Sequence, residues 1–256
     1  MVKSNCSDYK DCSSIVGPSH LLHMWSLAIV LALAVYPLHA APVSTTLEPW
    51  HTPCAGQTVA EIVQDLPDFA TMAVPTQSPQ EHIRGLKSLV SEGANIVKKV
   101  IDSEYREHFG SDVLAFLDSK DSHDGMPTIP QVTVEYLSDL SMEVFQDMFE
   151  RFARIAVFLE QAIRDESSPR GTERFKAKLM NVEHQIYNIL CKLKIMVHQQ
   201  GSIIQKRIKR SILSTELRSL DSMATIRARD YMVLRDTHKL LFHVTLEELK
   251  YLENNL

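Results

Sequence analysis

The sequence lacks the short motifs that mark the common catalytic sites. It contains no His-Glu-x-x-His, no Gly-x-Ser-x-Gly, no phosphate-binding P-loop and no Cys-x-x-Cys. A di-iron helical bundle needs Glu-x-x-His on two of its helices, and such a pair is absent. The histidines are scattered, which is typical of surface or hydrogen-bonded side chains. We therefore expect a protein that is not an enzyme, with no catalytic residues, no metal site and no cofactor.

An apolar run long enough to cross a bilayer is also missing. Trp25–Leu38 is apolar, but it is shorter than the roughly 20 residues that a spanning helix needs. It ends in Leu38–Ala41, where small residues are typical of a signal-peptidase site. We therefore expect residues 1–40 to be a signal peptide with an extended n-region, and the mature protein to be secreted and extracellular.

The segment before this run is unusual for a signal peptide, because it is long and its two lysines, Lys3 and Lys10, are balanced by two aspartates. An uncleaved amphipathic or buried segment is the alternative. Met24, just before the run, is a second candidate start.

Cysteine is scarce, with four in the whole chain. Removal of residues 1–40 would leave Cys54 and Cys191, and two cysteines in an oxidising compartment allow only one pairing. On a helix over 172–197, Cys191 lies almost opposite the apolar stripe, so it is not ordinary core filling. We predict a Cys54–Cys191 disulfide; two free thiols or a bridge between chains are the alternatives.

Acidic residues outnumber basic ones, and the formal net charge of -5 argues against a nucleic-acid partner. The exception is the basic run Lys206–Arg210. Within it Arg207, Lys209 and Arg210 form a pattern that proprotein convertases cut, before Ser211. Cleavage there would separate the last predicted helix from both mature cysteines. A solvated loop and a weak heparan sulfate contact are the alternatives.

Apolar residues at three- and four-residue spacing predict long amphipathic helices. The first begins at a capping box, Ser78-Pro79-Gln80-Glu81, with proline at the first helical position. An irregular segment over 41–77 precedes it. The predicted helices span about 79–109, 132–165, 172–197 and 222–253.

Four residues of the last predicted helix are expected to point outward, away from the apolar side: Arg235, Lys239, Phe242 and Leu246. Exposed large apolar residues one turn apart, as Phe242 and Leu246 would be, often mark a protein contact. We therefore predict that these two side chains bind a partner.

The predicted helices are joined by a long, a short and a second long connection. A short connection makes neighbouring helices antiparallel, whereas a long one can return along the molecule and leave them parallel. We therefore expect an all-α fold over 78–256, a long-chain four-helix bundle with up-up-down-down order and two long crossover loops.

Several segments resemble the leukemia inhibitory factor and ciliary neurotrophic factor branch of the interleukin-6 type cytokines. Asn188–Leu193 is similar to Asn-Val-Leu-Cys-Arg-Leu of leukemia inhibitory factor, whose cysteine bonds to the N-terminal segment. This implies the same bond between Cys191 and Cys54. Ile83-Arg84 and Ala94-Asn95 are spaced as in that factor. Three further segments resemble ciliary neurotrophic factor: Leu117–Ser119, Asp124–Pro127 and Met232–Asp236.

The resemblance implies a secreted cytokine with growth factor activity and a part in the immune response. Its partners would be the ectodomains of a shared signalling chain and of a chain like the leukemia inhibitory factor receptor, which trigger JAK-STAT signalling. The shared chain would bind the outer faces of the first and third helices. The candidate residues on those faces are Glu92, Lys99, Arg106, Met180 and His184.

The chain departs from the family pattern at two positions. A second cysteine of the third helix is replaced by Lys194. The Phe-x-x-Lys that contacts the leukemia inhibitory factor receptor near the start of the last helix aligns with Ala224 and Arg227, so the cation is kept and the aromatic ring is not. Ala224 and Arg227 are therefore the candidate residues for that receptor.

A secreted lipid carrier of the apolipoprotein kind is the alternative function. Such a protein would open its amphipathic helices around lipid. A carrier should bind liposomes without a cooperative melt, whereas a cytokine should melt cooperatively and ignore lipid.

Overall fold

The computed structural model describes residues 48–54, 78–106, 108–168 and 171–255. All of them belong to the unit Leu47–Leu256. Over these residues the chain is all-α, because it is mostly helical and has no strand. None of the described helices is long and apolar enough to cross a membrane. The expected signal peptide and most of the segment over 41–77 lie outside the described residues.

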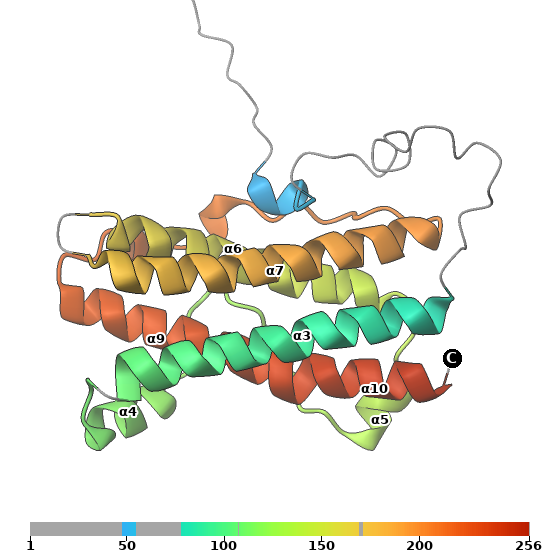
Figure 1. Cartoon of the computed structure of the whole chain (residues 1–256), viewed down its shortest axis with the longest axis horizontal. Helices are drawn as coiled ribbons and strands as arrows, with labels where there is room; N and C mark the ends of the chain where they lie inside the picture. Colours follow the sequence, from blue (N-terminus) through green and yellow to red (C-terminus); the bar gives the residue numbers. More distant parts are fainter. Residues whose placement is uncertain (1–47, 55–77, 107, 169–170, 256) are drawn as a thin grey trace, which may run out of the picture. The chain divides into compact units, whose positions relative to one another are not determined.

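Long helices lie side by side in this part of the chain (Figure 1). A π-helical turn follows the first of them and divides the last. In chain order they are α3 (Pro79–Ile101) with the π turn Asp102–Arg106, α6 (Val144–Glu166), α7 (Glu173–Gln199), and α9 (Met223–Lys239), whose π turn Leu240–Thr245 leads into α10 (Leu246–Asn255).

Short helices occupy the connections between the long ones. The helix α4 packs against α9, and its residue Leu117 is buried. The long connections therefore return to the body of the protein rather than extending from it. The short helices are η1 (Pro49–His51), α4 (Ser111–Asp118), α5 (Val134–Ser138), η3 (Arg210–Ile212) and α8 (Thr215–Arg218).

Helix α3 begins at the capping box that the sequence predicts. The Ser78 hydroxyl accepts a hydrogen bond from the Glu81 backbone N–H at 3.3 Å, and the Glu81 carboxylate accepts one from the Ser78 N–H at 2.7 Å. Two backbone donors at the helix start are thereby satisfied, which stabilises the helix by about 1 kcal/mol.

The region over 132–165 is two helices, where the sequence predicted one. Helix α5 covers Val134–Ser138 and starts at a Thr133 cap, and α6 begins only at Val144. Between them the Ser141 hydroxyl accepts a hydrogen bond from the Glu143 N–H at 3.3 Å. Serine and aspartate side chains compete with the helical backbone for hydrogen bonds, so a short Asp-Leu-Ser stretch favours the break.

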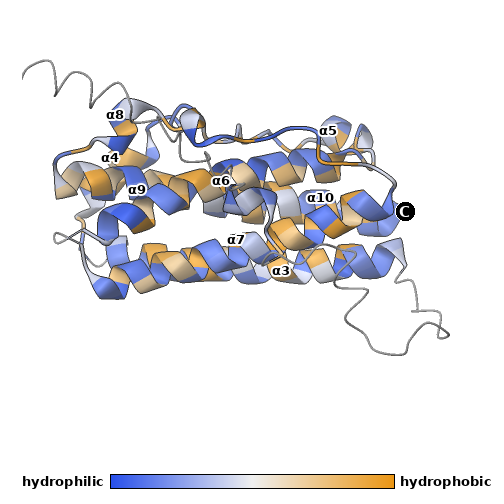
Figure 2. Cartoon of the chain, turned by 90° about the horizontal axis from the view of Figure 1, so that it is seen from above, coloured by the Kyte–Doolittle hydropathy of each residue, from blue (hydrophilic) through white to orange (hydrophobic). Residues whose placement is uncertain are grey.

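The core forms where the apolar stripes of the long helices meet. Figure 2 shows hydrophobic and hydrophilic residues alternating along each helix. Every residue of the predicted stripe of α7 is buried, with no more than 1% of its surface exposed. The stripe consists of Phe175, Leu179, Val182, Ile186, Ile189, Leu190, Leu193 and Val197.

The segment Glu48–Cys54 is fixed to the outer side of α7 by the Cys54–Cys191 disulfide, so the predicted pairing is present. Within this segment Trp50 is completely buried. The Lys194 ammonium donates to the His51 carbonyl oxygen at 3.1 Å. We call Glu48–Cys54 the tethered segment.

Ion pairs between helix ends show which ends lie together. Arg84, in the second turn of α3, contacts Glu253 near the end of α10, with 3.0 Å between nitrogen and oxygen. Glu166, the last residue of α6, contacts Arg227 in the second turn of α9 at 3.1 Å. Lys178, early in α7, contacts Glu104 at the end of the first helix.

Candidate functional site

The five residues predicted on the outer faces of α3 and α7 are all exposed, and Met180 has 50% of its surface exposed. Lys99 lines a groove of about 490 Å³ with Asn181 and Lys178 of α7. We call this exposed surface the α3–α7 face. Its members are Glu92, Lys99, Arg106, Met180 and His184.

The charges of the α3–α7 face differ in how far they are compensated. Arg106 lies 3.3 Å from Asp102, which also pairs with Lys98 at 2.5 Å. Within the described part of the chain, Glu92 and Lys99 take part in no ion pair. Glu92 and Lys99 are therefore the charged side chains most available to a binding partner, because an ion pair with the partner would not require breaking one within the protein.

Ala224 and Arg227, at the start of α9, are placed differently from each other. Ala224 is exposed, whereas Arg227 has only 18% of its side chain exposed. The Arg227 guanidinium lies 3.8 Å from the ring centroid of Phe175 and pairs with Glu166. Arg227 therefore holds α9 against α6 and α7, and a partner could reach only the edge of its guanidinium.

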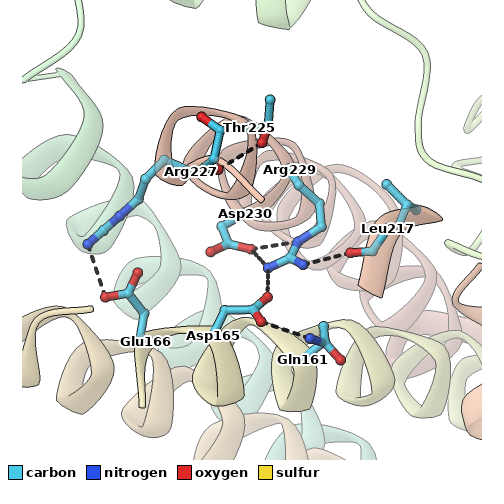
Figure 3. A network of polar contacts seen from close by, with 9 residues as sticks. Gln161, Asp165, Glu166, Leu217, Thr225, Arg227, Arg229 and Asp230 are labelled. Atoms are coloured by element: carbon cyan, nitrogen blue, oxygen red, sulfur yellow. Dashed lines mark hydrogen bonds and ion pairs between the residues drawn. The ribbon is translucent and has the colours of Figure 1, made fainter. Parts of the chain in front are cut away.

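Arg227 borders a buried polar network that the sequence reasoning missed (Figure 3). Arg229 lies 2.7 Å from Asp165 and 2.5 Å from Asp230, and it donates to the Leu217 carbonyl oxygen at 3.0 Å. Gln161 donates to Asp165 at 2.9 Å. The closely spaced charges of Arg227, Arg229 and Asp230 were the available signal, but the sequence alone did not reveal that α6 supplies their partners.

Burial raises the pKa of Asp230 to about 6, and the attraction of the Arg229 guanidinium reduces this shift without cancelling it. The pKa of Arg229 is itself raised, because its carboxylate partners outweigh the effect of its own burial. The ion pairs of Arg229 with Asp165 and of Arg227 with Glu166 therefore fix α9 on α6.

Phe242 is half exposed, as predicted, but Leu246 is buried, with 8% of its surface exposed. The expectation that Leu246 points outward is wrong. The π turn Leu240–Thr245 has a wider turn than an α-helix, so residues after it are rotated by about one residue position. Leu246 therefore turns toward α3, where it lines a groove of about 790 Å³ together with Glu92 and Lys99.

Arg235 is also buried, with 6% of its surface exposed, although the sequence predicted that it points outward. Its guanidinium donates to the carbonyl oxygens of Leu117, at 2.5 Å, and Lys120, at 3.1 Å, and pairs with Asp236. The end of α4 therefore covers this side of α9, which a helical pattern alone cannot anticipate.

Two histidines surround the exposed ring of Phe242. The His238 ring stacks on it with centroids 5.7 Å apart, and the His243 ring meets it edge-on at 5.0 Å. Burial lowers the pKa of His238, and the nearby His243 lowers it further. We call these three residues the Phe242 patch.

We expect Phe242→Ala and Leu246→Ala to differ in stability, although both remove a large apolar side chain. Phe242→Ala should change the free energy of unfolding by less than about 1 kcal/mol, because half of the ring is already in water. Leu246→Ala should cost about 2–3 kcal/mol, because it leaves a cavity between α10 and α3. Urea unfolding of both variants checks this, and equal losses would contradict the rotation at the π turn.

The basic run Lys206–Arg210 is only partly solvated. Arg207 and Lys209 are exposed, whereas Ile208 is buried, with 3% of its surface exposed. The Arg210 guanidinium donates two hydrogen bonds of 2.7 Å to the Glu160 carboxylate. Glu183 of α7 is coupled to the same Glu160: burial, and then the charge of Glu160, raise the pKa of Glu183 to about 7.

Neither the chemistry nor the comparisons add a site of another kind. Among the described residues, no group of three or more His, Cys, Asp or Glu side chains could hold a metal ion. Comparisons of the chain with protein families, curated proteins and solved structures return no match.

Proposed function

We propose that this chain is a secreted cytokine of the interleukin-6 type, which brings receptor chains together at the cell surface and thereby triggers JAK-STAT signalling. The proposal includes the finer fold, a long-chain four-helix bundle of up-up-down-down order formed by α3, α6, α7 and α9–α10. The main observation in support of this proposal is the set of ion pairs that join the ends of the long helices.

The contacts between helix ends support this order. The start of α3 lies beside the end of α10, since Arg84 contacts Glu253, so these helices are antiparallel. The end of α6 lies beside the start of α9, since Glu166 contacts Arg227. The start of α7 lies beside the end of the first helix, since Lys178 contacts Glu104. Helices α3 and α6 then run one way, and α7 and α9–α10 run the other way.

The described surface also supports a receptor-assembling function. The α3–α7 face and the Phe242 patch each expose a large apolar side chain, Met180 and Phe242, with half of its surface exposed. Ala224 marks a third exposed surface, at the start of α9. A packed helical core holds such surfaces at fixed distances, and receptor chains bound to them are brought to a fixed separation.

The experiment is a binding assay of the secreted protein against candidate receptor ectodomains, with one variant of the α3–α7 face and one of the Phe242 patch. Met180→Ala with His184→Ala should weaken one ectodomain by about tenfold or more and leave the others unchanged. Phe242→Ala should weaken a different one. Val134→Ala is the matched control, since its side chain is 79% exposed and lies outside the three surfaces. If no ectodomain of this receptor type binds, the proposal is wrong.

A STAT reporter assay then tests the assembly step itself. A variant that no longer binds one receptor chain should still bind the others. We therefore expect it to give no reporter signal and to inhibit signalling by the unmodified protein. A variant that binds one chain and signals fully would contradict signalling by assembly.

Melting in the presence of liposomes separates this proposal from a lipid carrier. Opening the helices around lipid would break the ion pair between Arg229 and Asp230, each with 2% or less of its surface exposed, and leave these charges unpaired beside an apolar phase. We therefore expect one cooperative thermal transition that liposomes do not change. Loss of that transition together with liposome binding would favour the carrier.

A further inference from the structure

The run Arg207-Ile208-Lys209-Arg210 places basic side chains at the first, second and fourth positions before the Arg210–Ser211 peptide bond. Serine proteases that recognise this pattern bind their substrates as extended strands. The arginine side chain before the bond enters an acidic pocket, and its carbonyl oxygen enters the oxyanion hole. The structure shows whether these groups are available.

Arg207 and Lys209 are available, because both are exposed and, in the part of the chain that the structure describes, neither takes part in an ion pair. Ile208, between them, is held. Its carbonyl oxygen accepts a hydrogen bond of 2.7 Å from the Trp50 indole N–H and lies 2.9 Å from the His51 Nε2. Its side chain is buried.

Arg210 is held even more firmly. Its guanidinium donates two hydrogen bonds of 2.7 Å to Glu160 and lies 5.1 Å from the ring centroid of Trp50. Its carbonyl oxygen, the one that a protease would polarise, accepts a hydrogen bond from Arg218 at 3.1 Å and one from the Leu213 N–H at 3.2 Å. The short helix η3 starts at Arg210, so the backbone there is coiled rather than extended.

The tethered segment makes several of the contacts that hold Ile208 and Arg210 in place. Trp50, with none of its surface exposed, lies against Ile208 and Arg210. The disulfide from Cys54 to Cys191 keeps Trp50 at a high effective concentration beside them. Without it, the segment would be held only by packing and a few hydrogen bonds.

We propose that the Arg210–Ser211 bond is a latent processing site for a secretory-pathway protease specific for basic residues, covered by the tethered segment and exposed when Trp50 is displaced. Hydrolysis would break the C–N bond of this peptide, and water would complete the carboxyl group of Arg210 and the amino group of Ser211. After the cut, α9–α10 has no covalent link to the rest of the chain, because Cys54 and Cys191 both precede the bond, and it is held by packing, ion pairs and hydrogen bonds. This inference shares the expectation of secretion with the proposed function, but it does not depend on receptor binding.

The test is digestion of the secreted, disulfide-bonded protein by a purified furin-type convertase, with the fragment that begins at Ser211 followed by mass spectrometry. Cleavage of a covered bond follows the population of the locally open state. Trp50→Ala should therefore be cut at least about tenfold faster than the unmodified protein, and Glu160→Gln should also be cut faster. Mild reduction followed by alkylation should accelerate cleavage of the unmodified protein in the same way.

Leu249→Ala is the matched control, because it removes a fully buried side chain from α10 without touching the tethered segment. If it is cut as fast as Trp50→Ala, cleavage proceeds through general unfolding and the proposal is wrong. It is equally wrong if the unmodified protein is cut as fast as Trp50→Ala, or if no variant is cut. Arg210→Ala should abolish the fragment, and its persistence would place the cut elsewhere.

Discussion

Replacing Cys54 and Cys191 together with serine will lower the free energy of unfolding by about 3–5 kcal/mol. The bond closes a loop with a sequence separation of 137 residues. In the chain-entropy account, closing so long a loop removes many conformations from the unfolded chain, so opening it favours unfolding. Urea unfolding, with the midpoint and slope fitted together, measures the loss.

The reduced and alkylated unmodified protein is the control for this prediction. It should match the double serine variant in stability, and adding reductant to the variant should change nothing. A loss below about 1 kcal/mol would mean that the bond restrains only the tethered segment and leaves the unfolding of the helices unaffected.

Arg229→Met should cost about 3–5 kcal/mol at neutral pH, because it removes the cation that neutralises two carboxylates. Asp230 has 1% of its surface exposed, so it would be left as an uncompensated buried charge. Methionine keeps most of the side-chain volume, so a cavity contributes little to the loss. Arg174→Met is the matched control, since Arg174 is 79% exposed and should contribute less than about 0.5 kcal/mol.

The pH dependence of this variant has a definite sign. The pKa of Asp230 is raised in the folded protein, to about 6, from an unfolded value of 3.8. A carboxyl group with a raised pKa contributes stability that is present below its unfolded pKa and lost as the pH rises through its folded pKa. Removing Arg229 raises that pKa further, so Arg229→Met should lose less stability at pH 5 than at pH 7.5. Equal losses at both pH values would contradict a buried charge as the cause.

Periodicity was sufficient for the features that depend on a single helix. The stripe from Phe175 to Val197 is buried as predicted, and the capping box at Ser78 forms as predicted. Both depend on residues within a few turns of each other, where spacing along the chain translates directly into position on a helix. The position of Cys191 opposite that stripe followed from the same geometry, and the disulfide is present.

Features that depend on distant contacts or on helix irregularity were not predictable in this way. Leu246 was assigned to the surface on the assumption that each residue rotates the helix by about 100°. In the π turn before it the rotation per residue is smaller, so the assumption fails there. Arg227 was assigned to a receptor contact from its place in a motif, whereas most of its side chain lies against Phe175 and Glu166. The burial of Trp50 depends on a segment far along the chain, which no local pattern encodes.

The candidate surfaces were also predictable only where they depend on the geometry of a single regular helix. The α3–α7 face was predicted from helix geometry, and its residues are exposed. Of the pair predicted on the last helix, Phe242 is exposed and Leu246 is not. The histidines that surround Phe242 were not singled out, although His238 and His243 are close to it in the sequence, because a stacked arrangement depends on side-chain orientation rather than spacing.

The π turn Leu240–Thr245 also makes this stretch tolerant of changes in length. A π turn holds one residue more than an α turn, so deleting a single residue here would let the backbone close into regular α turns. Leu249 and Leu252 would then keep their orientation. The same deletion within α9 would rotate everything beyond it by about 100° and bring buried leucines to the surface. Single-residue insertions and deletions in the last helix should therefore be better tolerated at this turn than elsewhere in that helix.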